Sequence, residues 1–129
     1  MLKENLMCAD IDKKLIRQIL YKNKENIVGD IRTASYDNDN IVVKQQEDII
    51  MNFCKEFNVN CKEIYIDNGF SGLNYDRPGI KEIINSGRNE VILVSDMVRI
   101  SRDYLGMNNF TEKINKSIIG ITDGIIINN

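Results

Sequence analysis

The chain has 129 residues, 43% of them hydrophobic and 28% charged, with a formal net charge of −2. This balance is typical of one globular domain and argues against a disordered chain. We find no secretory signal and no apolar run near the ~20 residues that cross a bilayer. We therefore expect a cytoplasmic protein without a membrane anchor. The sequence contains no histidine, which excludes Ser-His-Asp and Cys-His catalysis and most zinc sites.

The first 25 residues are predicted to form a helical extension. Five apolar residues fall at helical spacing between charged ones: Ile11, Leu15, Ile16, Ile19 and Leu20. Acidic residues offset the lysines of this segment, which weakens any attraction to anionic lipid. We therefore expect the helix to pack against the domain or a dimer partner rather than to lie on a membrane.

Strand and helix patterns alternate from residue 26 to about residue 124. The predicted strands cover 26–33, 61–67, 90–95 and 117–122, and the predicted helices cover 42–58, 79–86 and 102–115. Such alternation predicts an α/β domain with a mainly parallel sheet of four to five strands flanked by helices. Residues 125–129 are expected to form a tail.

Three motifs carry four arginines, which are Arg32, Arg77, and the pair Arg99 and Arg102. Each motif follows the end of a predicted strand, at Arg32, Ser71 and Arg99. The carboxyl ends of parallel strands meet at one edge of a sheet, so we expect these arginines to converge there. Guanidinium groups bind phosphate oxygens in a planar fork that lysine cannot copy. On a chain that is acidic overall, this pattern predicts a local anion site rather than a diffuse basic surface.

The order and spacing of these motifs resemble the catalytic domain of the serine site-specific recombinases, the resolvase/invertase family. The run from Asp67 to Gly79 reads DNGFSGLNYDRPG and repeats the family pattern of Ser-Gly, four residues, Arg and Pro-Gly without a gap. The run from Arg99 to Asp103 reads RISRD and resembles the second arginine element of the family. The resemblance covers roughly residues 26–124 and implies a three-layer resolvase-like domain.

The resemblance also implies a chemistry. In the family, a serine hydroxyl attacks the scissile DNA phosphate and forms a phosphoserine link, while arginines stabilise the charge on the phosphate oxygens. Neither a metal nor a nucleotide cofactor is needed. Carried over to this chain, the arginines that hold the phosphate are Arg32, Arg77, Arg99 and Arg102, and the supporting residues are Gln46 and Ser71.

One position departs from the family pattern. Where the family has Arg-x-Ser, this chain has Arg32-Thr33-Ala34, and a serine follows one place later at Ser35. Ala34 has no hydroxyl and cannot attack, so Ser35 is the candidate nucleophile nearby. Successive side chains on an extended segment point to opposite faces, and a displacement of about 1 Å can cost about 100-fold in rate. Ser35 is therefore not automatically a substitute.

Two functions remain open at this point. The first is a serine recombinase that cleaves and exchanges DNA strands through Ser35. The second is a catalytically inactive module that dimerises with a recombinase or regulates it. An enzyme acting on a small phosphorylated substrate is a weaker third alternative, because nothing in the sequence resembles a nucleotide or sugar pocket.

The expected partners follow from charge and from the end of the chain. A net charge of −2 leaves only a local basic patch, so we expect weak DNA binding by the chain alone. Family members continue into a dimer helix and a DNA-binding region, which we do not find before Asn129. We therefore expect a homo-oligomer or a heteromer with a full-length recombinase. Cys8, Cys54 and Cys61 form no CxxC motif and are expected to be reduced core thiols.

Overall fold

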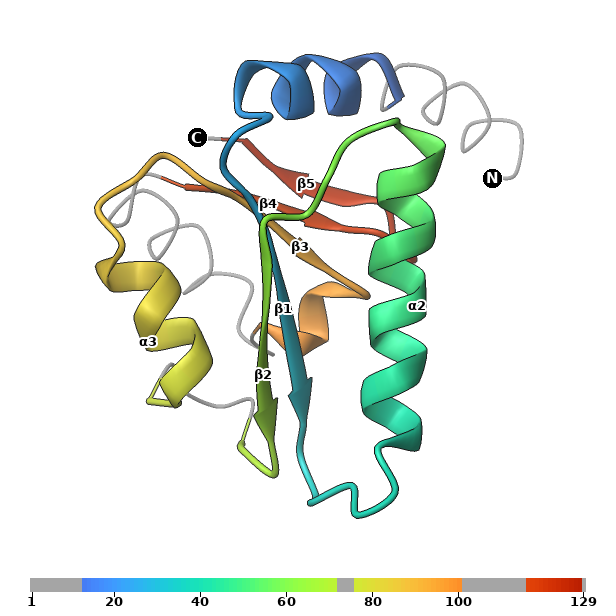
Figure 1. Ribbon diagram of the computed structural model, residues 1–129, viewed down its shortest axis with the longest axis vertical. Coiled ribbons are helices and arrows are strands. Elements are labelled where there is room, and N and C mark those ends of the chain that lie inside the picture. Colours follow the sequence, from blue (N-terminus) through green and yellow to red (C-terminus); the bar gives the residue numbers. More distant parts are fainter. Residues whose placement is uncertain (1–12, 72–75, 101–115, 129) are drawn as a thin grey trace.

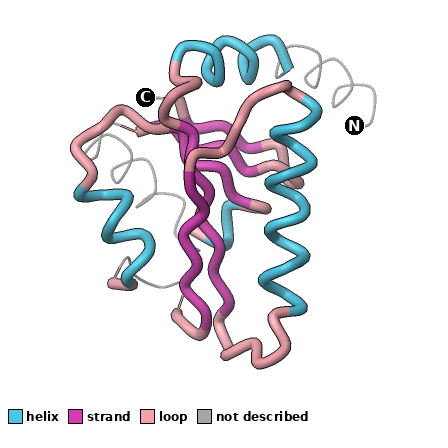
Figure 2. The backbone as a smooth tube through the Cα atoms, in the orientation of Figure 1, coloured by secondary structure: helices cyan, strands magenta, loops and turns pink. Residues whose placement is uncertain are grey.

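The computed structural model describes residues 13–71, 76–100 and 116–128. Within these ranges a five-stranded sheet lies between helices, as Figures 1 and 2 show. The strands are β1 (Ile27–Thr33), β2 (Glu63–Asn68), β3 (Val91–Val94), β4 (Ser117–Gly120) and β5 (Ile125–Ile127). The helical elements are α2 (Ile41–Glu56), α3 (Pro78–Asn85), the short 3-10 helix η1 (Met97–Arg99) and a helix over residues 13–22.

The sheet has the strand order β2-β1-β3-β4-β5. Every neighbouring pair is parallel except β4 and β5, which are antiparallel. The helices α2 and α3 lie on opposite sides of the sheet in Figure 1. This arrangement is the three-layer α/β fold with a mainly parallel sheet that the alternation of strands and helices predicted.

The strand β1 is buried along its whole length and carries two charged side chains. Neighbouring side chains on a strand point to opposite faces of the sheet. Ile27 and Ile31 join the core beneath α2, whereas Val28 joins the core beneath α3. Asp30 and Arg32 alternate with Ile31, so both leave the strand toward the α3 face. A charged group in such a position requires a partner, because an isolated buried charge is very costly.

The helix α2 presents one stripe of side chains to the sheet. Val43, Gln46, Ile50 and Phe53 are buried and recur at intervals of three and four residues, which places them on one face of the helix. Gln46 is therefore part of the buried stripe rather than a surface glutamine. This position brings its amide group against the end of β1.

The segment after residue 124 differs from its prediction. It was expected to be a tail, but Ile125–Ile127 form β5 and pair with β4 in antiparallel register, with Ile118 opposite Ile127. Gly124 has a φ of 67°, a conformation that suits glycine and lets the chain reverse between the two strands. The three consecutive isoleucines are strong strand formers.

The helix over residues 13–22 packs on the domain, as its apolar spacing predicted. Ile16, Ile19 and Leu20 are buried in the core that also contains Ile27 and Phe53. None of the helices in the described ranges is long and apolar enough to cross a membrane. The predicted helix over 102–115 lies outside the described residues.

Candidate functional site

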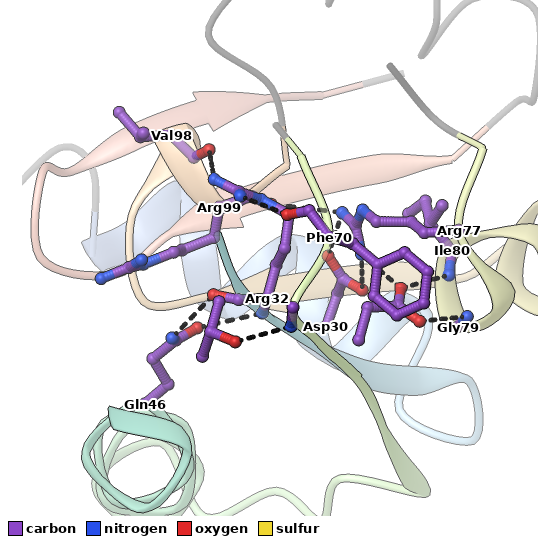
Figure 3. Close-up of polar contacts among 12 residues, drawn as sticks. Asp30, Arg32, Gln46, Phe70, Arg77, Gly79, Ile80, Val98 and Arg99 are labelled. Carbon is purple, nitrogen blue, oxygen red and sulfur yellow. Dashed lines mark hydrogen bonds and ion pairs between the residues drawn. The ribbon is translucent and has the colours of Figure 1, made fainter. Parts of the chain in front are cut away.

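The guanidinium group of Arg77 lies in a buried cluster with two carboxylates (Figure 3). Its Nη1 and Nη2 donate hydrogen bonds to the two oxygens of Asp30, at 2.9 and 2.8 Å. Nη1 also donates to Oδ2 of Asp67 at 2.6 Å. The side chains of all three residues are at most 1% exposed. The contact with Asp30 is the two-pronged fork that a guanidinium also offers to a phosphate.

Asp67 connects this cluster to the start of α3. Besides Arg77, its carboxylate accepts hydrogen bonds from the backbone N–H groups of Gly79 at 2.7 Å and Ile80 at 3.2 Å. These groups belong to the first turn of α3, where no intrahelical carbonyl is available to them. A Cβ atom at Gly79 would lie 2.9 Å from the Asp67 carboxylate, so glycine is what allows this close approach.

Burial shapes the electrostatics of the cluster. Burial raises the pKa of Asp30 above its ordinary value, and the hydrogen bonds and charge of Arg77 offset only part of this effect. Burial alone would lower the pKa of Arg77, but Asp30 and Asp67 outweigh it and raise that pKa, so the guanidinium stays charged. Two carboxylates therefore share one guanidinium in a site closed to water.

Arg32 joins three separate backbone segments. Its Nε donates to the carbonyl oxygen of Arg99 at 2.9 Å, Nη1 to that of Phe70 at 2.9 Å, and Nη2 to that of Val98 at 3.0 Å. The side chain is 1% exposed. The end of β1, the loop after β2 and η1 are thus held together by one guanidinium, as Figure 3 shows.

Gln46 holds the backbone of Arg32. Its Nε2 donates to the Arg32 carbonyl oxygen at 2.9 Å, and its Oε1 accepts from the Arg32 N–H at 3.3 Å. The strand β3 pairs with β1 only at residues 27–29, so it no longer flanks β1 at residue 32. The side-chain amide of Gln46 takes its place and satisfies both backbone groups, which would otherwise be buried without a partner.

The segment that carries the candidate nucleophile directly follows β1. Thr33 is buried, and its hydroxyl donates to Oδ1 of Asn68 at 2.6 Å and accepts from the Gly69 N–H at 2.9 Å. Ala34 and Ser35 are both exposed. Thr33 thus anchors the end of the strand, and the two residues after it lie at the surface.

The remaining predicted site residues have different surroundings. Arg99 lies at the end of η1, with 30% of its side chain exposed and its Nε 3.6 Å from Oδ2 of Asp96. Ser71 is exposed at the beginning of the loop before α3. Arg102 lies outside the described residues. In the part of the chain that is described, Arg99 is therefore the predicted phosphate-binding arginine that is open to solvent.

Three of the four arginines come together at one edge of the sheet, as expected from their positions in the sequence. Arg32 and Arg77 both donate to the carbonyl oxygen of Arg99, at 2.9 and 3.2 Å. Their guanidinium groups bind other parts of the chain rather than facing solvent, so a role in holding a phosphate stays a prediction. Sequence reasoning missed Asp30 and Asp67 as the partners of Arg77. An aspartate inside the apolar run of β1 was the signal, because a buried carboxylate needs a cation.

Comparison with known proteins identifies the fold. The family model described as "Resolvase, N terminal domain" matches residues 27–123. No curated protein matches the chain. Among solved structures, the N-terminal catalytic domain of TP901-1 integrase aligns with a TM-score of 0.67 and 21% identity, covering 78% of this chain and 82% of that one.

Two further structures have the same fold. A resolvase family site-specific recombinase from Streptococcus pneumoniae aligns with a TM-score of 0.59 and 21% identity, covering 78% of this chain and 75% of that one. The C-terminal catalytic domain of IS1535 TnpA, an IS607-like serine recombinase, aligns with a TM-score of 0.60 and 19% identity, covering 71% and 68%. At these identities the likeness concerns the fold alone.

Proposed function

The chain belongs to the resolvase N-terminal domain family, and we propose that it takes part in DNA recombination as a non-cleaving module that pairs with an intact recombinase of the same class. The sequence left a cleaving enzyme and an inactive module open. The described site favours the module.

The observation that carries this proposal is the state of Arg77. Its guanidinium fork is closed on the Asp30 carboxylate at 2.8 and 2.9 Å, and Asp67 binds it from a second side. A DNA phosphate would have to displace a carboxylate that is covalently part of the chain. It would also have to approach two buried carboxyl groups, and negative charge on these groups repels an anion in a site of low dielectric. Arg77 is thus better suited to hold the fold together than to hold a substrate.

The surroundings of the nucleophile position support the same conclusion. Ala34, in register with the family's serine, has no hydroxyl. Arg32, two residues before it, uses Nε, Nη1 and Nη2 on backbone carbonyl oxygens. Transition-state stabilisation requires donors that are already aimed at the developing charge. Neither Arg32 nor Arg77 is aimed in that way here.

Arg99, Arg102 and Ser71 remain as the proposed contacts with DNA. Arg99 and Ser71 are accessible, and Arg102 is included from the sequence motif. Few phosphate contacts on a chain of net charge −2 predict weak, salt-sensitive DNA binding. We therefore expect an intact recombinase to supply strand cleavage and most of the DNA affinity.

A covalent trapping assay tests the proposal. The full chain is incubated with a supercoiled plasmid that carries the DNA flanking its own coding sequence, and the reaction is stopped in denaturant. We expect no protein–DNA adduct for the wild-type chain. An adduct that disappears in Ser35→Ala would refute the proposal and establish Ser35 as a nucleophile. Tyr36→Phe serves as the matched control, because it removes an exposed hydroxyl from the residue next to Ser35.

The pairing part of the proposal has its own readout. The chain is co-expressed with an intact resolvase-type recombinase from the same genome and a reporter plasmid carrying that enzyme's sites. We expect the chain to change the recombination frequency without contributing a phosphoserine link. Equal frequencies with and without the chain would refute pairing with that recombinase.

A further inference from the structure

Two cysteines lie side by side on the side of the sheet that α2 covers. Cys54 is on the last turns of α2 and is 2% exposed, whereas Cys61 lies in the segment between α2 and β2 and is half-buried. Both are free thiols. The turn between them is closed by a hydrogen bond from the Val59 N–H to the Cys54 carbonyl oxygen at 3.0 Å. Asn58 adopts a left-handed φ of 55°, which reverses the chain and returns Cys61 toward the helix.

The two thiols lie beside each other, because both side chains line the same surface cavity. Sγ of Cys61 also lies 3.3 Å from the carbonyl oxygen of Glu63, which fixes its position at the start of β2. The hydrogen bond from Cys61 lowers the pKa of the Cys54 thiol, because it stabilises the thiolate more than burial disfavours it. The same contact raises the pKa of Cys61.

A surface cavity lies beside this pair. Its volume is about 430 Å³, and both cysteines line it together with Lys55, Asn58 and Asn60. Lys55 is the charged residue among those that line the cavity. A cationic and amide-lined opening without a carboxylate favours a thiolate at its base. The cavity therefore combines two neighbouring thiols and an entrance.

We propose that Cys54 and Cys61 form a redox-active dithiol that a small hydroperoxide oxidises to an intramolecular disulfide. The Cys54 thiolate attacks the terminal peroxide oxygen, the O–O bond breaks, and hydroxide leaves with hydrogen peroxide or an alkoxide with an organic hydroperoxide. Cys54 becomes a sulfenic acid. The Cys61 sulfur then attacks the Cys54 sulfur, and the hydroxyl group leaves as water with the proton of the Cys61 thiol. In sum, two thiols are oxidised to one disulfide. Hydrogen peroxide is reduced to two water molecules, and an organic hydroperoxide to one water and one alcohol.

The roles of the two residues differ. Cys54 is the attacking residue because its thiolate is stabilised by the neighbouring thiol. Cys61 is the resolving residue because it is held at the start of β2 within reach of Cys54. A structural role alone would require only two small apolar side chains at these places, as free cysteines often supply. It would not require that both thiols line one opening at the surface.

Oxidation would tie the end of α2 to the start of β2. These elements meet at the turn that Asn58 and Val59 form, and a cross-link there restricts the opening of the turn. We therefore expect slower amide hydrogen exchange at Val59 in the oxidised protein, since the hydrogen bond to Cys54 would open less often. A thiol reductant such as dithiothreitol reverses the change.

The experiment uses the full chain with Cys8→Ser, because Cys8 is the remaining cysteine of the sequence. The protein is treated with hydrogen peroxide, quenched with catalase and alkylated in denaturant. We expect an intact mass lower by two hydrogen atoms, no alkylation, and full recovery of both thiols after dithiothreitol. Disulfide-linked dimers alone, or two thiols that are alkylated as in the untreated protein, would overturn the proposal.

Two matched variants in the same background test the assigned roles. In Cys61→Ser, Cys54 should accumulate a sulfenic acid that dimedone traps. In Cys54→Ser, we expect the remaining thiol to react at least about 10-fold more slowly with peroxide, because the lowered thiol pKa is lost. Equal rates in the two variants would overturn the assignment of Cys54 as the attacking residue. Alanine variants at both positions control for effects of the serine hydroxyl.

Discussion

The substitution Arg77→Ala should destabilise the fold far more than the loss of a surface arginine would. It leaves the Asp30 and Asp67 carboxylates buried, hydrogen-bonded to no cation, and at most 1% exposed. Breaking a buried ion pair by removing one partner costs about 3–5 kcal/mol. A chain of 129 residues has an unfolding entropy of about 0.27 kcal/mol/K. The expected fall in Tm is therefore about 10–20 °C.

Urea denaturation followed by circular dichroism measures this change directly. Arg88→Ala is the matched control, because Arg88 is 45% exposed and its nearest carboxylate oxygen, on Glu90, is 3.4 Å away. Glu90 is buried but keeps a second cation, because Nζ of Lys116 lies 3.2 Å from its Oε1, so the control should cost no more than about 1 kcal/mol. The double variant Arg77→Met with Asp30→Asn should recover part of the loss, since it removes one of the two unpaired charges. A loss below about 1 kcal/mol in Arg77→Ala would refute the reasoning that the arginine holds the fold together.

Three further predictions concern neighbouring parts of the site. Gly79→Ala places a Cβ 2.9 Å from the Asp67 carboxylate and should cost about 1–3 kcal/mol of unfolding free energy in the same urea assay; an unchanged midpoint would contradict the close approach. Gln46→Ala leaves the Arg32 N–H and carbonyl buried without partners and should cost about 2–4 kcal/mol, whereas Gln46→Glu should retain the bond that Oε1 accepts. Burial raises the folded-state pKa of Asp30 above 3.8, so the native state binds this proton more tightly than the unfolded state does. The unfolding free energy of the wild type relative to Asp30→Asn should therefore fall as the pH rises from 3.8 through the folded-state pKa, and then level off. A difference that grows with pH in urea titrations would show that the pKa is lowered instead.

Local patterns predicted most of the fold. The strand and helix boundaries for β1, α2, α3, β3 and β4 agree with the structure within about two residues, because apolar spacing reports directly on which face is buried. The strand β5 was missed because Ile125–Ile127 is a short apolar run at the end of the chain, with no alternation to mark it. Its pairing with β4 depends on a turn at Gly124 that becomes visible only as a backbone angle.

The site was harder to predict because its residues are defined by their partners. Spacing placed Arg32, Arg77 and Arg99 at one edge of the sheet. It could not reveal whether a guanidinium faces solvent or a buried carboxylate, since this depends on which side of β1 carries Asp30. Gln46 presented the same difficulty: a glutamine is usual on a surface, and only its place in the buried stripe of α2 connects it to Arg32.

The three carbonyl contacts of Arg32 have a consequence for how such sequences evolve. An arginine that joins β1, the loop after β2 and η1 stabilises the fold, whether or not the protein ever meets a phosphate. Selection for a stable domain alone would therefore preserve it after strand cleavage had been lost. In descendants of this domain, a retained arginine at this position would record the demands of the scaffold, and the residue at position 34 would be the better indicator of chemical activity.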